Sequence, residues 1–418
     1  MQIIVVNRGV QPETIQIGFA LKTSESLFAY VTSSSFGFDH WLVKYFSKNF
    51  GFKKIKNLLR RRTINIEEGL IIRKYFPLEL IARLLPNTKF AYLLREIIDN
   101  RLKNFVMKKY IGDTDIDYIL CQDSFGPIRK IDKSFSRKKL ILNISTVSPY
   151  FYNKMLVEER TRATDWFQYY PKKKFSAKEL MCFDRDIEIA DLILIPSIFV
   201  KQSIFIEDST SKIHVVPLGF DPKVIISTRS QARNLSGSFV SPLKIIYVGQ
   251  VQQRKGIGYL VEAFKHANLP IGSKLTLIGM ANKEITKKLK NYDFIELIGH
   301  ISRNEISKYL DDSDLYVLPS LIEGFALSAI EAMSTGIPVA VSTSSLGTVI
   351  KDKLNGILFQ PGNILELAET LRWCVNHKNS LEKIGWEGKS TAKEFTWEQY
   401  RIKIITIIDD MHRLNSWV

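Results

Sequence analysis

The alternation of short apolar runs with helical patterns in the second half most constrains the fold of this chain. Apolar runs occupy residues 243–249, 274–279, 294–299, 315–320 and 338–342, and helical patterns lie between them. Strands that are buried on both faces have such unbroken apolar sequences, and helices serve as the crossovers of a parallel sheet. The pattern therefore predicts a doubly wound α/β domain.

The first half has the same kind of pattern with less regular spacing. Six further apolar runs predict buried strands: residues 2–7, 28–33, 117–122, 139–145, 191–197 and 212–218. Residues 41–110 are predicted to be mostly helical, and the polar, Gly- and Ser-bearing residues 227–242 are the best linker candidate. We therefore expect two Rossmann-like domains, each a doubly wound parallel sheet, that face a central cleft.

Length and composition agree with this expectation. A chain of 418 residues exceeds one ordinary core, and 45% hydrophobic with 24% charged residues is typical of a globular protein. The three cysteines are scattered and fit no metal-ligand spacing, which indicates a reducing compartment. The first residues resemble a strand rather than a signal peptide, and no apolar run reaches the ~18 residues that span a bilayer. We expect a cytoplasmic protein.

The net charge of +16 is concentrated in the first half, where residues 1–200 carry 33 Lys and Arg against 21 Asp and Glu. Residues 42–63 alone hold eight basic residues and no acidic one, with aromatic and aliphatic residues between them. Such a segment can be a solvated surface helix, or it can lie on anionic lipid. It can also face nucleic acid. We favour an anionic membrane surface over nucleic acid, with the protein peripheral on the inner face of the membrane.

Two carboxylates interrupt the apolar segment 315–342. Glu323 follows the run 315–320, where the loop at the carboxyl end of the strand is expected, and Glu331 lies in the predicted helix 325–334. Ligands of doubly wound sheets bind at this edge, and the N–H groups that begin the helix suit a diphosphate. Carboxylates beside it can accept hydrogen bonds from sugar and ribose hydroxyls. The N–H groups expected to be free belong to three consecutive residues: Phe325, Ala326 and Leu327.

The segment "EGFALSAIEA" resembles the E-x7-E signature of retaining glycosyltransferases of the GT-B fold, closest to glycosyltransferase family 4. The resemblance extends to "ADLILIPSIFVKQSI", "IHVVPLGFDP", "IIYVGQVQQRKGI", "LIGHI", "GIPVAVSTSSLGTVIKDKLNGILFQPGN" and "FTWEQY", and so covers most of residues 180–400. The first 180 residues resemble the family only in their strand pattern, as expected of an acceptor-binding domain.

The resemblance implies an acceptor domain at residues 1–222, a donor domain at 223–395 and a final helix at 396–418 that returns to the first domain. It implies that Glu323 contacts the donor sugar and Glu331 the ribose, while Lys255, with Arg254, binds the leaving phosphates. The remaining expected donor-binding positions surround these residues: Gly249, Gln250, Gly299, His300, Ile301, Gly324, Phe325, Ala326 and Leu327.

The chain departs from the family pattern at two places. Gln250 stands where the family usually has an arginine, and Ser145 and Thr146 stand where many members have a histidine near the donor sugar. Ser145, Thr146 and His40 are the acceptor-side candidates. No metal site is expected, because three acidic clusters should lie away from the cleft mouth: Asp113, Asp115 and Asp117; Asp184 and Asp186; Asp311, Asp312 and Asp314.

The resemblance thus implies a metal-independent retaining glycosyltransferase without a cofactor. It would move a sugar from a nucleoside-diphosphate sugar to a glycan or lipid-linked acceptor in cell-surface polysaccharide biosynthesis, such as O-antigen or capsule. Two alternatives remain: a non-catalytic GT-B protein that binds sugar or polyanion, and a nucleotide-sugar epimerase.

Overall fold

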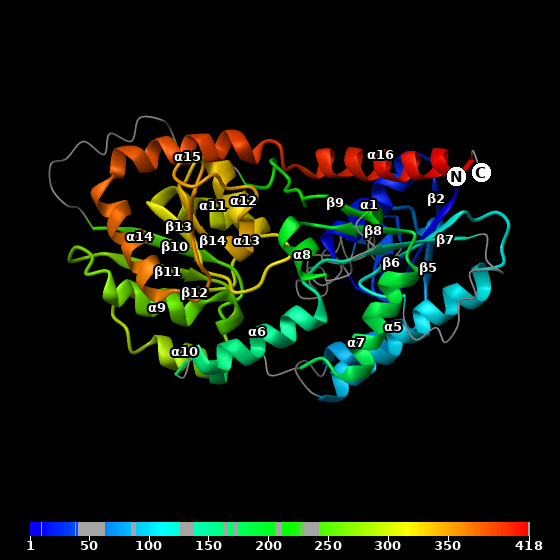
Figure 1. Ribbon diagram of the computed structural model, residues 1–418, viewed down its shortest axis with the longest axis horizontal. Helices are drawn as coiled ribbons and strands as arrows, with labels where there is room; N and C mark the ends of the chain where they lie inside the picture. The colour runs from blue at the N-terminus through cyan, green and yellow to red at the C-terminus, as the bar shows by residue number, and fades with distance from the viewer. Residues whose placement is uncertain are drawn as a thin grey trace.

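The computed structural model describes residues 1–9, 11–37, 39–40, 63–84, 89–125, 138–162, 165–170, 174–204, 211–225, 227–229 and 242–416. Residues 42–62 of the basic segment and residues 230–241 of the expected linker lie outside the described residues. Within the described part, two parallel sheets lie in two α/β domains side by side (Figure 1). The predicted fold class is confirmed.

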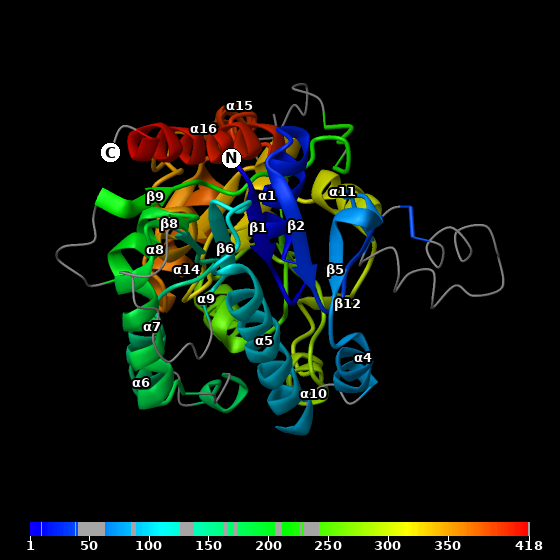
Figure 2. The ribbon, with the colours of Figure 1, turned by 90° about the vertical axis from the view of Figure 1, so that its right-hand side faces the viewer.

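The sheet of the first domain has the order β5-β2-β1-β6-β7-β8-β9 (Figure 2). The interior strand β1 is unbroken by polar residues, because helices cover both faces of the sheet and all four of its side chains are fully buried. Its strands are β1 Ile3–Val6, β2 Leu27–Thr32, β5 Ile71–Arg73, β6 Tyr118–Gln122, β7 Lys139–Asn143, β8 Leu192–Ile195 and β9 Ile213–Val215. A separate two-residue pair joins β3 Phe36–Gly37 to β4 Thr63–Ile64.

The sheet of the second domain has the order β12-β11-β10-β13-β14-β15. The order reverses direction between β10 and β13, and this is the edge where a doubly wound sheet binds ligands. Its strands are β10 Lys244–Val248, β11 Lys274–Ile278, β12 Ile295–Gly299, β13 Leu315–Leu318, β14 Val339–Ser342 and β15 Ile357–Phe359.

Helices cover both sheets. Those in the first half of the chain are α1 Pro12–Thr23, α4 Phe76–Leu84, α5 Lys89–Tyr110, α6 Pro149–Arg162, α7 Ala177–Ile189 and α8 Ile198–Ser203. Those in the second half are α9 Ile257–His266, α10 Lys283–Leu289, α11 Arg303–Asp312, α12 Leu327–Thr335, α13 Thr343–Leu346, α14 Ile364–Asn376, α15 Lys378–Ala392 and α16 Trp397–Ser416.

The last helix, α16, lies along the first domain, although the preceding helix α15 belongs to the second (Figure 1). Arg401 Nη1 donates to Gln16 Oε1 of α1 at 2.6 Å, and His412 Nδ1 lies 3.0 Å from the Tyr118 hydroxyl of β6. At the crossing, Phe220 pairs with Thr396, and a Cβ on Gly219 would lie 2.2 Å from the Thr396 carbonyl carbon. The chain therefore crosses between the domains twice, once after Phe220 and once at Thr396, and the two crossing segments pack tightly against each other.

The eleven apolar runs of the sequence all contain strands, but three details of the prediction are wrong. Residues 63–73, expected to be helical, form β4, a 3₁₀ turn and β5, because Ile71–Arg73 pairs with the edge of the sheet at β2. The three-residue strand β15 has no long apolar run to reveal it, and pairing with β14 creates it. Helix α12 begins at Leu327 instead of Phe325. In the described part of the chain, no helix is both long and apolar enough to cross a bilayer.

Candidate active site

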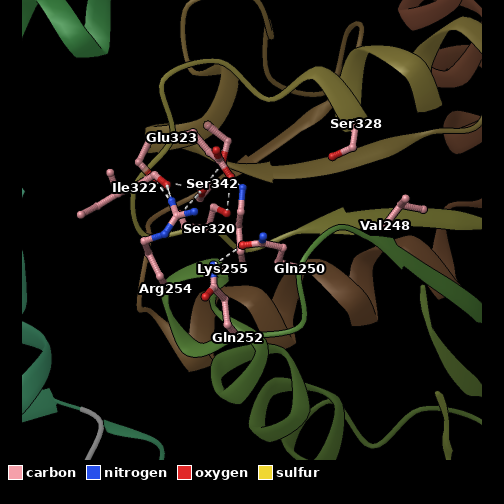
Figure 3. A network of polar contacts seen from close by, with 12 residues as sticks. Val248, Gln250, Gln252, Arg254, Lys255, Ser320, Ile322, Glu323, Ser328 and Ser342 are labelled. Carbon is pink, nitrogen blue, oxygen red and sulfur yellow. Dashed lines mark hydrogen bonds and ion pairs between the residues drawn. The ribbon is translucent and has the colours of Figure 1, made fainter. Parts of the chain in front are cut away.

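The two loops that follow the neighbouring strands β10 and β13 meet at an ion pair between Lys255 and Glu323 (Figure 3). Glu323 Oε1 also accepts a hydrogen bond from Ser320 Oγ at 2.7 Å, and only 8% of Glu323 is exposed. Burial lowers the pKa of Lys255, Glu323 opposes this effect, and the adjacent Arg254 adds to it. The predicted cation and the predicted sugar-binding carboxylate are therefore direct neighbours.

The conformation of the first loop depends on close backbone packing. Gly256 ends the 3₁₀ turn Gln253–Lys255 with φ +75°, and a Cβ there would lie 1.9 Å from the Pro319 carbonyl oxygen. Arg254 joins the loops a second time: its Nη1 donates to the Ile322 carbonyl at 2.9 Å, and its own carbonyl accepts from the Leu321 amide at 3.0 Å. Arg254 thus holds the second loop in place, and its expected phosphate contact stays a prediction.

Glu331 lies in α12 with its side chain 13% exposed, and its Oε1 is 3.7 Å from Arg303 Nη2 at the start of α11. Burial raises the pKa of Glu331, and Arg303 counteracts this rise. A mostly buried carboxylate at the carboxyl-end edge of the sheet can accept hydrogen bonds from a diol. Arg303 was not predicted, because no motif in the sequence marks it.

The segment between β12 and α11 carries three expected donor-binding residues. Gly299 has φ +82°, and its carbonyl already accepts from the Gly279 amide at 2.8 Å. His300 is exposed and Ile301 is half-buried. Only Ser302 separates these residues from Arg303, so they lie on the same edge of the sheet as Glu331, and backbone contacts to a base stay a prediction.

Gly249 and Gln250 follow β10 at the same edge. The Gly249 amide donates to the Ile278 carbonyl at 2.9 Å, and the Gln250 carbonyl accepts from the Tyr247 hydroxyl at 2.7 Å. The Gln250 side chain is exposed and accepts from Gln252 Nε2 at 2.9 Å (Figure 3). An uncharged, exposed amide therefore occupies the place where the family usually has an arginine.

The first turn of α12 differs from the sequence expectation at one residue. Ala326 is the N-cap, and the Leu327 amide donates to the Phe325 carbonyl at 3.0 Å, so the prediction that this amide is free is wrong. Phe325 is buried beside this turn, and its ring centroid lies 5.9 Å from that of Phe395.

The first domain meets this loop directly. A Cβ on Gly324 would lie 1.8 Å from the Ser145 carbonyl oxygen, so only glycine permits the contact. Ser145 itself donates from its amide and its hydroxyl to Asp123 Oδ1, at 3.0 and 2.9 Å, and Thr146 beside it is exposed. The positions of the missing histidine thus face the loop of Glu323. Asp123, with φ +61°, is a polar residue of this edge that the sequence analysis missed.

The third acceptor-side candidate, His40, lies in a different polar cluster of the first domain. Its Nε2 is 3.8 Å from Glu68 Oε1, its ring packs against Phe36, and burial lowers its pKa. Glu68 in turn pairs with Arg73 at 2.7 Å. The described contacts of His40 therefore place it with β3 and β5, and a contact to an acceptor stays a prediction.

A buried carboxyl from the first half of the chain supports the loop that carries Lys255 from behind. Helix α6 runs beneath the second domain (Figure 1), and its Glu159 accepts from Gln253 Nε2 and from the Tyr259 hydroxyl, both at 2.7 Å. Gln253 Oε1 accepts from the Gly258 amide at 3.0 Å, and burial raises the pKa of Glu159. Glu159 thus positions the turn that carries Lys255. Nothing in the spacing of α6 signals this role.

The acidic clusters make structural contacts. Asp311 accepts from the Thr228 amide at 2.9 Å, Asp314 from the Lys244 amide at 2.9 Å, and Asp117 from the Gln2 amide at 2.7 Å. Asp186 accepts from the Phe125 amide at 3.1 Å. Among the described residues, no three His, Cys, Asp or Glu side chains are grouped so that they could hold a metal ion.

Comparisons with known proteins define the class. The whole chain superimposes on the sucrose-phosphate synthase of Thermosynechococcus elongatus with a TM-score of 0.65 and 17% identity, over 99% of this chain and 100% of that one. Anabaena HepE, solved in complex with UDP-glucose, matches with a TM-score of 0.60 and 16% identity over 98% and 100% of the two chains. The protein therefore has the GT-B fold of glycosyltransferases.

The second domain contains the match to a family model. Residues 229–391 match the model of the glycosyl transferases group 1 family. The amylovoran biosynthesis glycosyltransferase AmsK of Erwinia amylovora is 30% identical over 173 residues, which cover 38% of this chain and 41% of the relative. The chain spans about half the length of the first curated relatives that it matches.

The support from Glu159 can be tested by unfolding. Glu159→Leu leaves the buried Gln253 amide and Tyr259 hydroxyl without their acceptor, so we expect a loss of about 2–6 kcal/mol of stability, at about 1–3 kcal/mol for each unsatisfied group. Glu159→Gln keeps one acceptor and should lose less. Differential scanning calorimetry measures both changes.

The control is Glu158→Leu on the same helix, where only half-exposed ion pairs to Lys154 and Arg162 are lost. Equal melting temperatures for Glu159→Leu and Glu158→Leu would contradict the positioning role.

Proposed function

We propose that the protein is a retaining, metal-independent glycosyltransferase that uses a nucleoside-diphosphate sugar. The observation that carries this proposal is the ion pair between Lys255 and Glu323, together with Glu331 in the helix that follows the Glu323 loop. One buried cation and two buried carboxylates then border the edge where the group 1 domain would bind a ligand. The complexes of the similar HepE with UDP-glucose support a donor of this class.

In the proposed complex each residue has a distinct task. Glu331 accepts hydrogen bonds from the ribose hydroxyls, and Glu323 accepts them from hydroxyls of the donor sugar. Lys255 turns its ammonium toward the diphosphate, where it stabilises the negative charge that grows on the leaving group. Arg254 and the N–H groups that begin α12 add positive potential. These groups supply the charge that a metal ion supplies in other glycosyltransferases.

The reaction exchanges one bond for another on the same face of the sugar. The bond from the anomeric carbon to the phosphate oxygen breaks, and the bond from that carbon to the acceptor oxygen forms with retention of configuration. The acceptor proton passes to the departing diphosphate, so no side chain is required as nucleophile. Ser145 and Thr146 lie where the acceptor side meets the Glu323 loop, and we assign them to acceptor contacts.

The acceptor is a hydroxyl of a glycan or of a lipid-linked saccharide, in the assembly of a cell-surface polysaccharide. The similarity to the amylovoran biosynthesis glycosyltransferase supports this class. The basic residues 42–63 would hold the protein on the anionic inner face of the membrane, close to a lipid-linked acceptor.

The activity is tested with a panel of UDP-, GDP-, ADP- and TDP-sugars, by measuring the release of free nucleoside diphosphate. We expect slow release from one donor, and a drop of at least about a hundredfold in Glu323→Gln, because that variant loses an ionised acceptor for the sugar hydroxyls. The anomeric configuration of the product, read by NMR, should match that of the donor.

The matched control is Glu398→Gln on α16, far along the chain from both loops. No release from any donor, or equal rates in Glu323→Gln and Glu398→Gln, would favour the non-catalytic alternative.

The membrane contact is tested by flotation with vesicles that contain phosphatidylglycerol. We expect the wild type to float at low salt and a variant with Lys53, Lys54 and Lys56 changed to Ser to float less. Equal flotation of the two proteins would remove the proposed role of this segment.

A further inference from the structure

A pocket of about 200 Å³ lies between the two domains, next to the Glu323 loop, with which it shares Phe325. Its first wall is α8 with its N-cap Ser197, which follow the carboxyl end of β8. Its second wall is α13 and residues 347–349, which follow the carboxyl end of β14, and Phe325 also lines it. Figure 1 shows α8 and α13 facing each other at the junction of the domains. The pocket is therefore bordered by the carboxyl-end edges of both sheets, where such folds bind ligands.

The lining is neutral and mixed in polarity. Two aromatic rings, Phe199 and Phe325, and the aliphatic Leu346 and Val349 supply apolar surface. Hydroxyl and amide groups supply the rest, and none of the described lining residues carries a formal charge: Ser197, Gln202, Thr343, Ser345 and Thr348. A phosphate or carboxylate would find no cation here, and an acyl chain would leave these polar groups without partners.

The aromatic walls are held in place. Phe199 packs edge-to-face against Phe151 at 5.3 Å, and Phe325 packs against Phe395 at 5.9 Å. The negatively polarised face of such a ring attracts the C–H face of a pyranose, whose hydrogens carry partial positive charge. A sugar ring can therefore stack here while its hydroxyls reach the polar groups.

Two polar side chains at the pocket are available for such hydroxyls. Gln202 and Thr348 are exposed, and their side chains make no hydrogen bond within the described part of the chain. Ser197 Oγ already accepts from the Val200 amide at 3.2 Å, but its proton remains to be donated.

The pocket wall and the candidate active site share one hydrogen-bonded framework. Ser342 Oγ and Ser344 Oγ both donate to the Ser320 carbonyl at 2.6 Å, and Ser320 Oγ donates to Glu323. Ser345 joins this framework through Ser342 Oγ at 2.7 Å. A ligand in the pocket therefore lies against the same segment that fixes Glu323.

We propose that this pocket binds a neutral sugar ring of the acceptor glycan, close to the unit that receives the transferred sugar. The assignment of this sugar to the acceptor rests on the proposed function, whereas the binding of a neutral sugar rests on the pocket alone. The pocket would select acceptors whose neighbouring unit is uncharged.

The first test is direct binding without donor. Methyl glycosides of glucose, galactose, mannose and N-acetylglucosamine are offered to the wild type, and saturation-transfer NMR measures contact with the protein. We expect transfer to at least one glycoside and about a tenfold weaker affinity in the double variant Gln202→Leu/Thr348→Val, which keeps the side-chain volumes but removes two hydrogen-bonding groups. Each single variant should lose about threefold.

Gln399→Leu on α16 is the matched control, since it also replaces an exposed glutamine. Transfer to no glycoside, or equal affinity in the double variant and the wild type, overturns the proposal. If the wild type binds a glycoside but releases no diphosphate from any donor, the proposed function fails and the sugar pocket stands.

The second test uses the donor found in the activity panel. The Michaelis constant for a saccharide acceptor with a neutral penultimate unit should rise about tenfold in the double variant, and for an acceptor with a uronic acid there it should change little. Equal changes for both acceptors would overturn the selection of neutral units.

Discussion

The ion pair between Lys255 and Glu323 is the interaction on which the site depends. Each group is mostly buried, and a buried charge without a partner costs several kcal/mol, so the two loops are stable only when both are correctly placed. The pair joins the loops of the adjacent strands β10 and β13, where the strand order reverses. Gly256 and the two hydrogen bonds of Arg254, one from its side chain and one to its carbonyl, bring the loops close enough for the pair to form.

The first domain contributes to this arrangement although its sequence resembles the family least. Ser145 packs its carbonyl onto Gly324, and Glu159 holds the turn of Gln253 from the other side. The crossing at Gly219 and Thr396 returns α16 to α1, so the relative position of the domains is fixed at several separate contacts. A change in the first domain can therefore alter the loops of Lys255 and Glu323 without lying in either loop.

The sequence predicts the fold well, because buried parallel strands leave unbroken apolar runs such as Ile3–Val6 and Leu315–Leu318. It also singles out Glu323 and Glu331 as candidates, since two carboxylates interrupt an otherwise apolar segment, and the structure places both at one edge of the sheet with a cationic neighbour. It does not identify Arg303, Asp123 or Glu159, because their roles come from tertiary contacts. The hydrogen bond between Glu159 and Gln253, for example, joins residues that lie 94 positions apart in the sequence. Short strands such as β5 and β15 are missed because the pairing with a neighbour, rather than their own composition, makes them strands.

The central claim is that the carboxylates and the cation at the ends of β10, β12 and β13 form a nucleotide-sugar site. Isothermal titration calorimetry with UDP, GDP, ADP and TDP tests it most directly. We expect one diphosphate to bind with a stoichiometry of one, and to bind at least about tenfold more weakly to Glu331→Ala, where the acceptor for the ribose is lost. Binding by none of the four, or equal affinity in Glu331→Ala and the wild type, would contradict it.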